Sequence, residues 1–425
     1  MSSPEQPAAG NGWDALRHRS FLLFWSSRFL ATFGALMLSV SVGWQVYDIS
    51  RDPFDLGLVG LVQFAPALLL VLVTGSVADR YNRRVIMGLC QIVEGLCAVG
   101  FLVLTVSGTI SVGHIFAILA VFGVARAFLN PAAQSLVPNL VPARDLSSAI
   151  ALSSSSWQIA TIVGPVAGGL LYGFAAEAAY GAAFAFFVVA AGLIVLVPKP
   201  PQKTSREPAT LSTVIAGFRY IWHEKIVLGA ISLDLFAVLL GGATALLPAY
   251  ARDILDVGPW GLGLLRAAPA VGGVAVGLYL AARPVRDHAG IVMFTGVALF
   301  GLATIIFGAS HIVWLSIAAL AIMGAADMLS VYVRETLIQL WTPDVVRGRV
   351  SAVNMVFVGA SNELGEFRAG TVAALIGVVP AVVLGGIGTV IVAGLWSVWF
   401  PGLRTARRLD IPEVTTLAPE PPTPL

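Results

Sequence analysis

The stretch Gly75-Ser-Val-Ala-Asp79-Arg80-Tyr-Asn82-Arg83-Arg84 joins two apolar segments, 57–79 and 85–106, and carries four charges in a chain that is only 11% charged. Each segment is long enough to cross a bilayer as a helix, which needs about 20 apolar residues. The stretch is therefore expected to form a turn at a membrane face. Its three arginines indicate the cytoplasmic face, because short cytoplasmic loops carry an excess of Lys and Arg.

The rest of the chain has the composition of a membrane protein. Of its 425 residues, 57% are hydrophobic, whereas soluble domains contain about 45–50%. We therefore predict an all-α membrane protein with twelve transmembrane helices. The twelve apolar segments run at 21–49, 57–79, 85–106, 113–137, 149–174, 178–197, 226–251, 260–282, 290–309, 312–336, 350–374 and 377–400.

Positive charge is distributed unequally between the two sides of this topology. Of the 25 Lys and Arg residues, eighteen fall on the side of the Gly75–Arg84 turn, two fall in loops on the other side, and five lie within spans. This asymmetry predicts that both termini are cytoplasmic. Residues 1–20 are expected to be a cytoplasmic tail without a cleaved signal peptide. Residues 401–425, which end in a Pro-rich run, are expected to be a disordered cytoplasmic tail.

The two halves of the chain repeat one another. The polar segment 198–225 divides the spans six and six and is predicted to be a cytoplasmic linker. Before it, the chain reads Gly57-Leu-Val-Gly-Leu-Val-Gln63-Phe-Ala-Pro66-Ala, and after it Gly261-Leu-Gly-Leu-Leu-Arg266-Ala-Ala-Pro269-Ala. Matches of this kind share an offset of about 200 residues, which indicates an internal duplication. The sequence therefore predicts two pseudo-symmetric six-helix bundles, at 21–197 and 226–400.

The Gly75–Arg84 turn resembles the loop between the second and third helices of the major facilitator superfamily, Gly-x-x-x-Asp-Arg-x-Gly-Arg-Arg, with Asn82 in place of a glycine. Asn tolerates a left-handed turn, so the connection is expected to stay tight. The resemblance covers about residues 20–400 and implies the fold of that superfamily, with a substrate site between the bundles. An alternative is that the turn only sets topology. The resemblance implies a conformational gate at Gly75, Asp79, Arg80, Arg83, Arg84 and Asp145.

The fifth span contains Gly164-Pro165-Val-Ala-Gly168-Gly169, which resembles the core of the superfamily's antiporter signature. The family's earlier glycine is absent, because Ala160 stands at its expected position. Pro165 should bend the helix, and the glycines should form a flat face for a neighbouring helix. Close helix packing alone would explain the motif, but the resemblance favours export over uptake.

Ten polar residues within the spans are candidates for a substrate or proton pathway, because charged groups in a membrane usually face a cavity or a partner. Glu94 and Arg126 each lie about midway along a span and could pair, in either a structural or a transport role. Arg334 and Glu335 lie near a span end, where snorkelling to the membrane surface is the simpler interpretation. The candidates are Arg28, Gln63, Glu94, Arg126, Asp234, Arg266, Asp327, Glu363, Glu366 and Arg368.

The eleventh span is the most highly charged. Glu363 and Glu366 are three residues apart and should share one face of the helix. Burial would favour the protonated form of a carboxyl group, which is the condition for reversible proton uptake. Arg368 is expected to pair with Asp327 on the preceding span. The alternative is that both glutamates stay ionised and hydrogen-bonded.

No nucleotide-binding Gly-x-x-x-x-Gly-Lys-Ser/Thr loop and no His-Glu-x-x-His pattern occurs in the sequence, so we predict neither an enzyme nor a cofactor or metal site. The overall pattern resembles the drug and siderophore exporter branch of the superfamily. That resemblance implies a monomer in the bacterial inner membrane that exchanges protons for a small amphiphilic molecule by alternating access. Its expected partners are this substrate, protons and the lipid bilayer, and no nucleic acid. The alternatives are a proton-coupled importer and a non-transporting membrane sensor or scaffold.

Overall fold

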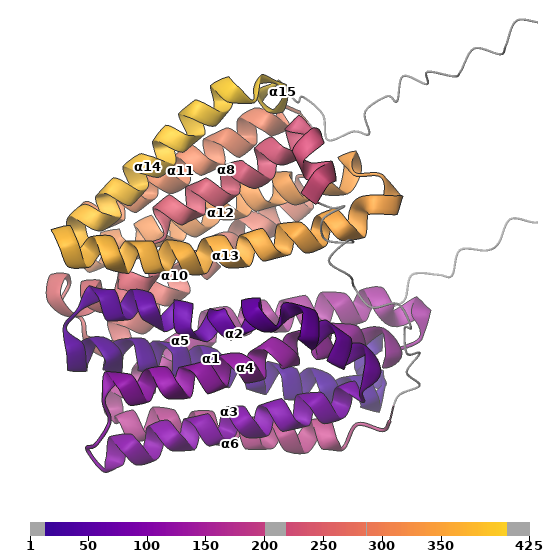
Figure 1. Ribbon diagram of the computed structural model, residues 1–425, viewed down its shortest axis with the longest axis vertical. Coiled ribbons are helices and arrows are strands. Elements are labelled where there is room, and N and C mark those ends of the chain that lie inside the picture. The colour runs from indigo at the N-terminus through magenta and orange to yellow at the C-terminus, as the bar shows by residue number, and fades with distance from the viewer. Residues whose placement is uncertain (1–12, 200–217, 286, 406–425) are drawn as a thin grey trace, which may run out of the picture.

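The computed structural model describes residues 13–199, 218–285 and 287–405, and these form helices and the turns between them. Figure 1 shows two helical bundles stacked on one another. Three short 3-10 helices accompany the first bundle: η1 (Asp14–Arg17), η2 (Val137–Asn139) and η3 (Ala143–Asp145). Its long helices are α1 (Arg19–Ser50), α2 (Pro53–Arg80), α3 (Arg83–Val106), α4 (Val112–Leu136), α5 (Leu146–Phe174) and α6 (Ala176–Val195).

The C-terminal bundle follows the linker. A short helical segment at 218–223 precedes it. Its first span is divided into α8 (Lys225–Gly241), η4 (Thr244–Leu246), α9 (Leu247–Ala249) and the π-helix η5 (Tyr250–Ile254). The remaining helices are α10 (Gly258–Ala282), α11 (Ala289–Ala309), α12 (Val313–Trp341), α13 (Asp344–Ile376), α14 (Val378–Trp399) and α15 (Pro401–Arg404).

Corresponding helices pack in the same way in the two bundles. Helix α2 packs against α4 as α10 packs against α12, and α3 packs against α6 as α11 packs against α14. Between the bundles, α5 packs on α10 and α2 packs on α13. Each of these contacts joins the second long helix of one bundle to the fifth of the other. The predicted arrangement of two pseudo-symmetric bundles is therefore confirmed.

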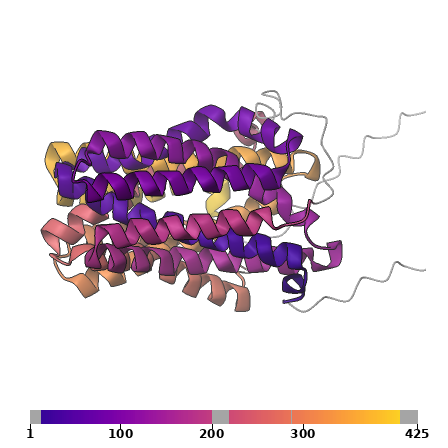
Figure 2. The ribbon, with the colours of Figure 1, turned by 90° about the horizontal axis from the view of Figure 1, so that it is seen from below.

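Eleven helical segments of the described chain are long and apolar enough to cross a membrane. Helix α13 is the remaining predicted span. It is also long enough, at 33 residues, but it is far more polar than the others. It packs against α2 and α8, between the two bundles, so its charged side chains need not face lipid. Both views show the long helices running roughly along one direction (Figures 1 and 2).

The seventh predicted span, 226–251, is not continuous. Helix α8 ends at Gly241, and Gly242 and Ala243 are not helical. Two consecutive glycines weaken a helix at this point. The break also follows from packing, because a Cβ on Gly242 would lie 3.2 Å from the backbone of Gly365 on α13. The close approach of the two chains thus coincides with the point where α8 stops.

The turn between α2 and α3 is tight, but not for the reason expected from the sequence. Asn82 has φ −66° and ψ 110°, which is an extended and not a left-handed conformation. Its side-chain oxygen accepts a hydrogen bond from the backbone N–H of Arg84 at 3.1 Å. Asn82 is therefore the N-cap of α3, a position at which Asn is strongly preferred.

The two bundles touch mainly at one end. We call the end that holds Trp13, Thr405 and the α2–α3 turn the tail end. At the opposite end, Gly169 of α5 packs against Gly263 of α10, where a Cβ would lie 3.1 Å from the neighbouring backbone. Towards the tail end, Trp157 of α5 is 45% exposed and Tyr279 of α10 is 58% exposed. Figure 1 shows the two bundles diverging from the Gly169–Gly263 contact towards the tail end.

Polar contacts also join the bundles at the opposite end. We call this group the opposite-end cluster: Tyr47, Asp48 and Arg51 of the N-terminal bundle with Arg252 and Asp253 of the C-terminal bundle. The Arg51 Nη1 donates to Asp253 Oδ1 at 3.2 Å, the Tyr47 hydroxyl donates to Asp253, and Arg252 pairs with Asp48. The guanidinium of Arg252 also lies 5.4 Å from the ring centre of Trp44, within range of a cation–π contact.

Candidate functional site

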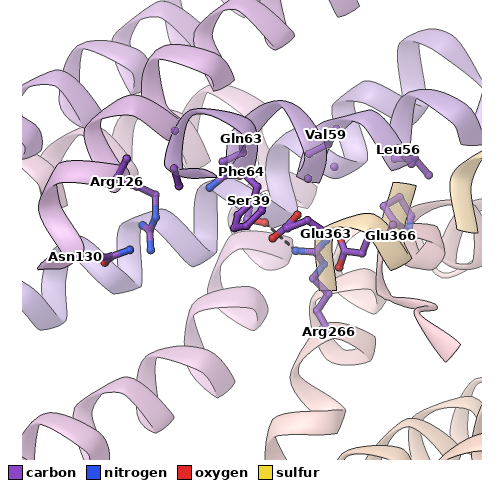
Figure 3. Close-up of a pocket in the computed structure, with 17 residues that line it drawn as sticks. Ser39, Leu56, Val59, Gln63, Phe64, Arg126, Asn130, Arg266, Glu363 and Glu366 are labelled. Atoms are coloured by element: carbon purple, nitrogen blue, oxygen red, sulfur yellow. Dashed lines mark hydrogen bonds between the residues drawn. The ribbon is translucent and has the colours of Figure 1, made fainter. Parts of the chain in front are cut away.

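A cavity of about 370 Å³ lies between the bundles, and its walls come from both of them (Figure 3). Five of the ten predicted pathway residues line it: Gln63, Arg126, Arg266, Glu363 and Glu366. Polar residues that the sequence analysis did not single out, including Ser39 and Asn130, line it as well. A cavity with polar groups from both halves is the expected form of a transporter's central site.

The C-terminal wall carries a cluster of three charges. Glu363 and Glu366 lie one helical turn apart on α13 and both reach the cavity, as their spacing predicted. Arg266 of α10 lies beside them (Figure 3). Its Nη1 donates a hydrogen bond to the Ser39 hydroxyl of α1 at 2.8 Å. Arg266 therefore neutralises part of the acidic wall and also connects the two bundles.

The break in the seventh span contributes to the same wall. The Thr244 hydroxyl, at the start of η4, donates to Glu366 Oε1 at 2.6 Å. An unbroken α8 would continue through this point, so the break is what presents Thr244 to the carboxylate. Within the described chain no such hydrogen bond joins Glu363 to a side chain, which leaves Glu363 as the less constrained of the two acids.

Gly60 of α2 faces the two carboxylates from the other bundle. A Cβ at this position would overlap Glu363 Oε2 and would lie 3.0 Å from Glu366 Oε2. One turn earlier, a Cβ on Gly57 would lie 3.0 Å from the carbonyl oxygen of Phe367. The two glycines therefore form a flat strip on α2 that lets α13 approach with its acidic side chains pointing into the interface.

The N-terminal wall carries Arg126 on α4. Its Nη1 lies 3.8 Å from Glu94 Oε1, so the predicted pair is formed. Glu94 is fully buried, and neither of its carboxylate oxygens has a hydrogen-bond partner in the described protein. The Arg126 guanidinium also lies 5.8 Å from the ring centre of Phe122. The pair is thus an ion pair without a hydrogen bond, and its role in stability or in transport stays a prediction.

Three of the remaining charges are arranged differently from the prediction. Arg334 is not at the membrane surface, because it is 3% exposed and pairs with Asp234 of α8. Arg368 does not pair with Asp327. Its Nη2 donates instead to the carbonyl of Leu240, in the last turn of α8. That carbonyl is available because the helix breaks after Gly241 and cannot supply its usual N–H partner.

Asp327 lies elsewhere, in a small space beside Asp234 between α8, α11 and α12. It lines this space together with Ser330 and Phe300. The acid therefore belongs to a second polar region of the C-terminal bundle, separate from the central cavity. Spacing along the chain could not reveal this, because it does not say which faces of three helices meet.

The predicted gate residues make their contacts within the N-terminal bundle. Asp79 lies 3.6 Å from Arg83, and Arg83 also donates to the carbonyl of Ser135 at 2.7 Å. Arg84 donates to the carbonyl of Val197, and Asp145 contacts His18 at 2.8 Å. A Cβ on Gly75 would meet no atom of the described protein within 4 Å, and Arg80 is exposed. The gate role of these residues stays a prediction.

The glycine-rich motif of α5 packs on two helices. A Cβ on Gly164 would lie 3.0 Å from Leu36 of α1, and one on Gly168 would lie 2.6 Å from the carbonyl oxygen of Met37. Gly169 and Pro165 meet α10 at Gly263. The flat face predicted for these residues is therefore present, and it fixes α5 against both bundles.

Residues 10–416 match the family described as transmembrane secretion effector. The chain belongs to this family of the major facilitator superfamily. Its proteins are membrane transporters, so this transporter is an integral membrane protein and not an enzyme. The predicted superfamily is thereby confirmed.

Characterised relatives of the transporter are exporters by name. It is 25% identical to the enterobactin exporter EntS of Escherichia coli O1:K1, across 94% of this chain and 95% of that protein. It is also 25% identical to EntS of Citrobacter koseri, across 92% and 94% of the two chains. These alignments cover nearly the whole length of both partners.

Solved structures with the same fold are also transporters. The bacterial homologue of the human lysosomal transporter Spinster, in an inward-facing and occupied conformation, superimposes with a TM-score of 0.72 at 15% identity, covering 90% of this chain and 96% of that one. The nucleoside transporter NupG gives a TM-score of 0.70 at 13% identity, covering 90% and 99%. At such identities the likeness concerns the fold alone.

Proposed function

We propose that this transporter exports a small amphiphilic molecule from the cytoplasm across the bacterial inner membrane in exchange for protons. The observation that carries the proposal is the cluster of Glu363, Glu366 and Arg266 at the central cavity, where two acids share one arginine. Export is supported by the two relatives named above, which are enterobactin exporters. The glycine motif of α5 supports the same direction.

The tail end is proposed to face the cytoplasm, because it carries most of the Lys and Arg residues. In this orientation the bundles separate towards the cytoplasm and are held together at the outer end by the opposite-end cluster. A substrate would then reach the cavity from the cytoplasm. Alternating access requires that the opposite-end cluster breaks and that contacts form at the tail end.

Proton exchange is proposed to use the acidic wall. Two carboxylates on one partly buried face repel each other, so the state with both ionised is disfavoured unless a cation compensates. Arg266 supplies one positive charge for two acids, which leaves room for one proton. A substrate that moves Arg266 or Ser39 would change the free energy of the state in which both carboxylates are ionised. Substrate binding and proton binding would therefore be coupled.

The experiment is transport by purified protein in vesicles of known orientation, with an imposed pH gradient. Export by proton exchange predicts that a fluorescent amphiphile accumulates in inside-out vesicles only when the lumen is acidic. Accumulation in right-side-out vesicles, driven by protons that enter with the amphiphile from an acidic exterior, would favour the importer. Absence of any gradient-dependent movement, with every amphiphile tried, would leave the sensor or scaffold as the better interpretation.

A further inference from the structure

A second and larger cavity, of about 540 Å³, lies in the N-terminal bundle nearer the tail end. It is bounded by α1, α4 and α5, and its polar wall comprises Arg28, Gln134, Ser153, Ser154 and Gln158. Its apolar wall includes Trp157, which is 45% exposed and so presents part of its ring to the space. The cavity is large enough for a drug-sized molecule, for which pockets measure about 300–1,000 Å³.

The second cavity adjoins the central one through a narrow neck of about 20 Å³. The neck shares Arg28 and Trp157 with the second cavity, and it shares Arg126 and Asn130 with the central cavity. This volume suffices for a water molecule but not for a substrate. The two larger spaces are therefore neighbouring positions along one route, with an arginine on each side of the constriction.

The charges along this route are not balanced. Arg28 forms no ion pair or hydrogen bond with any residue that the structure describes, although it is partly buried. Arg126 has Glu94 as its acidic partner, at 3.8 Å. The pair of arginines thus exceeds the available carboxylates by one positive charge. An arginine inside a membrane protein normally has an anionic partner, because leaving it without one is costly.

One uncharged polar group at the same place also lacks a partner. The Ser153 hydroxyl is buried in the described protein without a hydrogen bond, and it lines the second cavity beside Gln134 and Gln158. Such donors suit the oxygens of an acidic group. An indole beside a guanidinium suits an aromatic ring that carries negative charge, through stacking and through charge-assisted hydrogen bonds.

We propose that the second cavity is a binding site for aromatic organic anions, at which the substrate is held before it passes to the central cavity. The anionic group binds to Arg28 and Ser153, and the ring packs on Trp157. Arg126, across the neck, attracts the same group onward. The inference rests on the proposed transport function for its direction, and it assigns the substrate class: an aromatic molecule with net negative charge.

Binding to the full-length transporter in lipid nanodiscs tests this directly. Fluorescein and rhodamine 123 share a xanthene ring system but carry opposite charge at neutral pH, so fluorescence anisotropy of the two dyes separates charge from shape. Empty nanodiscs correct for partition into lipid. We expect fluorescein to bind about tenfold more tightly than rhodamine 123, and Arg28→Gln to weaken fluorescein binding about tenfold, as for the loss of a charged hydrogen bond.

Control variants separate recognition from general effects. Arg28→Lys retains the charge and should keep most of the affinity for fluorescein. Arg17 belongs to the same bundle and its side chain is 80% exposed, so Arg17→Gln should not change the binding of either dye. Trp157→Ala should weaken the binding of both dyes, because both contain the same ring system. Equal binding of the two dyes to the unmodified protein, or equal losses in Arg28→Gln and Arg17→Gln, would overturn the proposal.

A second measurement applies even where Arg28→Gln does not fold. Ser154→Cys places a thiol on the wall of the second cavity, whereas the native Cys90 and Cys97 are buried. Fluorescein should slow maleimide labelling of this thiol and rhodamine 123 should not. Equal labelling rates with and without fluorescein would place the dye elsewhere. Neither measurement uses a proton gradient, so failure of proton-coupled export and failure of this site are distinguishable.

Discussion

At the scale of single residues, Glu363 and Glu366 differ in how firmly they are held. Glu366 accepts a hydrogen bond from Thr244, whereas Glu363 points into the cavity towards Gly60 of the other bundle. Glu363 is therefore the better candidate for the acid that gains and loses a proton. Glu366, fixed by Thr244, is suited to setting the charge that Glu363 experiences.

Replacing each acid by Gln tests this assignment. Gln keeps the size of the side chain and mimics the protonated form. We expect Glu363→Gln to abolish the pH dependence of substrate-driven proton movement, measured with a pH-sensitive dye in inside-out vesicles, and Glu366→Gln to reduce it several-fold. If neither variant changes the pH dependence, the cluster is structural, and Asp234 or Glu94 becomes the next acid to test.

The sequence indicates the positions of single charges better than it indicates their partners. It placed Glu94 and Arg126 at similar depths, and the pair is formed. It failed for Arg368, whose partner is the carbonyl of Leu240. A backbone carbonyl becomes an acceptor only where a helix breaks, and the composition of α13 carries no information about a break in α8. It also placed Arg334 at the surface, although Asp234 pairs with it in the interior.

At the scale of helices, close packing depends on glycines at a few crossing points. Helices α10 and α12 approach so closely that a Cβ on Gly324 would overlap the backbone of Pro269, at 2.5 Å from its Cα. Backbone cannot move aside as a side-chain end can. Other spanning helices have glycines that contact no neighbouring helix. A Cβ on Gly192 of α6, for example, would meet no described atom within 4 Å.

These two glycines provide a matched pair of substitutions. We expect Gly324→Ala to destabilise the protein by about 1–3 kcal/mol, the usual cost of overpacking. Gly192→Ala should be neutral or stabilise it by up to about 1 kcal/mol, because Ala is the better helix former. Thermal unfolding in detergent, followed by the fluorescence of a thiol-reactive dye, measures both. Similar unfolding midpoints for the two variants would show that α10 and α12 can move apart to accept the added methyl group without loss of stability.

The bounds of the helices were more predictable than their interruptions. Apolar runs predicted the spans, because a bilayer requires about 20 consecutive apolar residues. The break after Gly241 lies within such a run and leaves its hydropathy unchanged. Gly241-Gly242 was the available signal in the sequence, but glycines in the other spans, such as Gly168-Gly169, occur within intact helices. Only the neighbouring helix decides which pair becomes a break.

At the scale of the whole molecule, the orientation in the membrane is a prediction from charge alone. Thr109 is exposed at the opposite end and Thr405 at the tail end. In intact cells, Thr109→Cys should react with an impermeant maleimide and Thr405→Cys should react only after the cells are opened. Cys90 and Cys97 are buried and should contribute little background labelling. The reverse labelling pattern would invert the orientation and, with it, the side from which the cavity is reached.

The conformational state was outside what the sequence could indicate, because one sequence specifies both states of an alternating-access cycle. In the structure, the opposite-end cluster joins the bundles while Asp79 contacts Arg83 of its own bundle. The two ends therefore differ in a way that a substitution can shift. Weakening contacts at one end should favour opening at that end, since the two states are in equilibrium.

Asp253 and Asp79 are the residues at which this equilibrium can be moved in opposite directions. Asp253→Asn removes an ion pair with Arg51 and weakens the hydrogen bond from Tyr47. Exposed ion pairs and single hydrogen bonds each contribute about 1 kcal/mol or less. We therefore expect about a fivefold shift towards the state that is open at the opposite end. Asp79→Asn should act the other way, because it weakens contacts that form at the tail end when that end closes.

A thiol in the central cavity reports the direction of the shift. Ala67→Cys lines the cavity, and the ratio of its labelling rates from the two sides of the membrane measures which end is open. Asp253→Asn should raise labelling from the opposite end, and Asp79→Asn should lower it. Asp14 forms an ion pair with Arg17 of the same short helix, η1, at 3.3 Å. Asp14→Asn breaks this pair and serves as the control that should leave the ratio unchanged. If Asp79→Asn shifts the ratio in the same direction as Asp253→Asn, the α2–α3 turn does not hold the tail end closed. Its arginines would then act only on the orientation of the helices in the membrane.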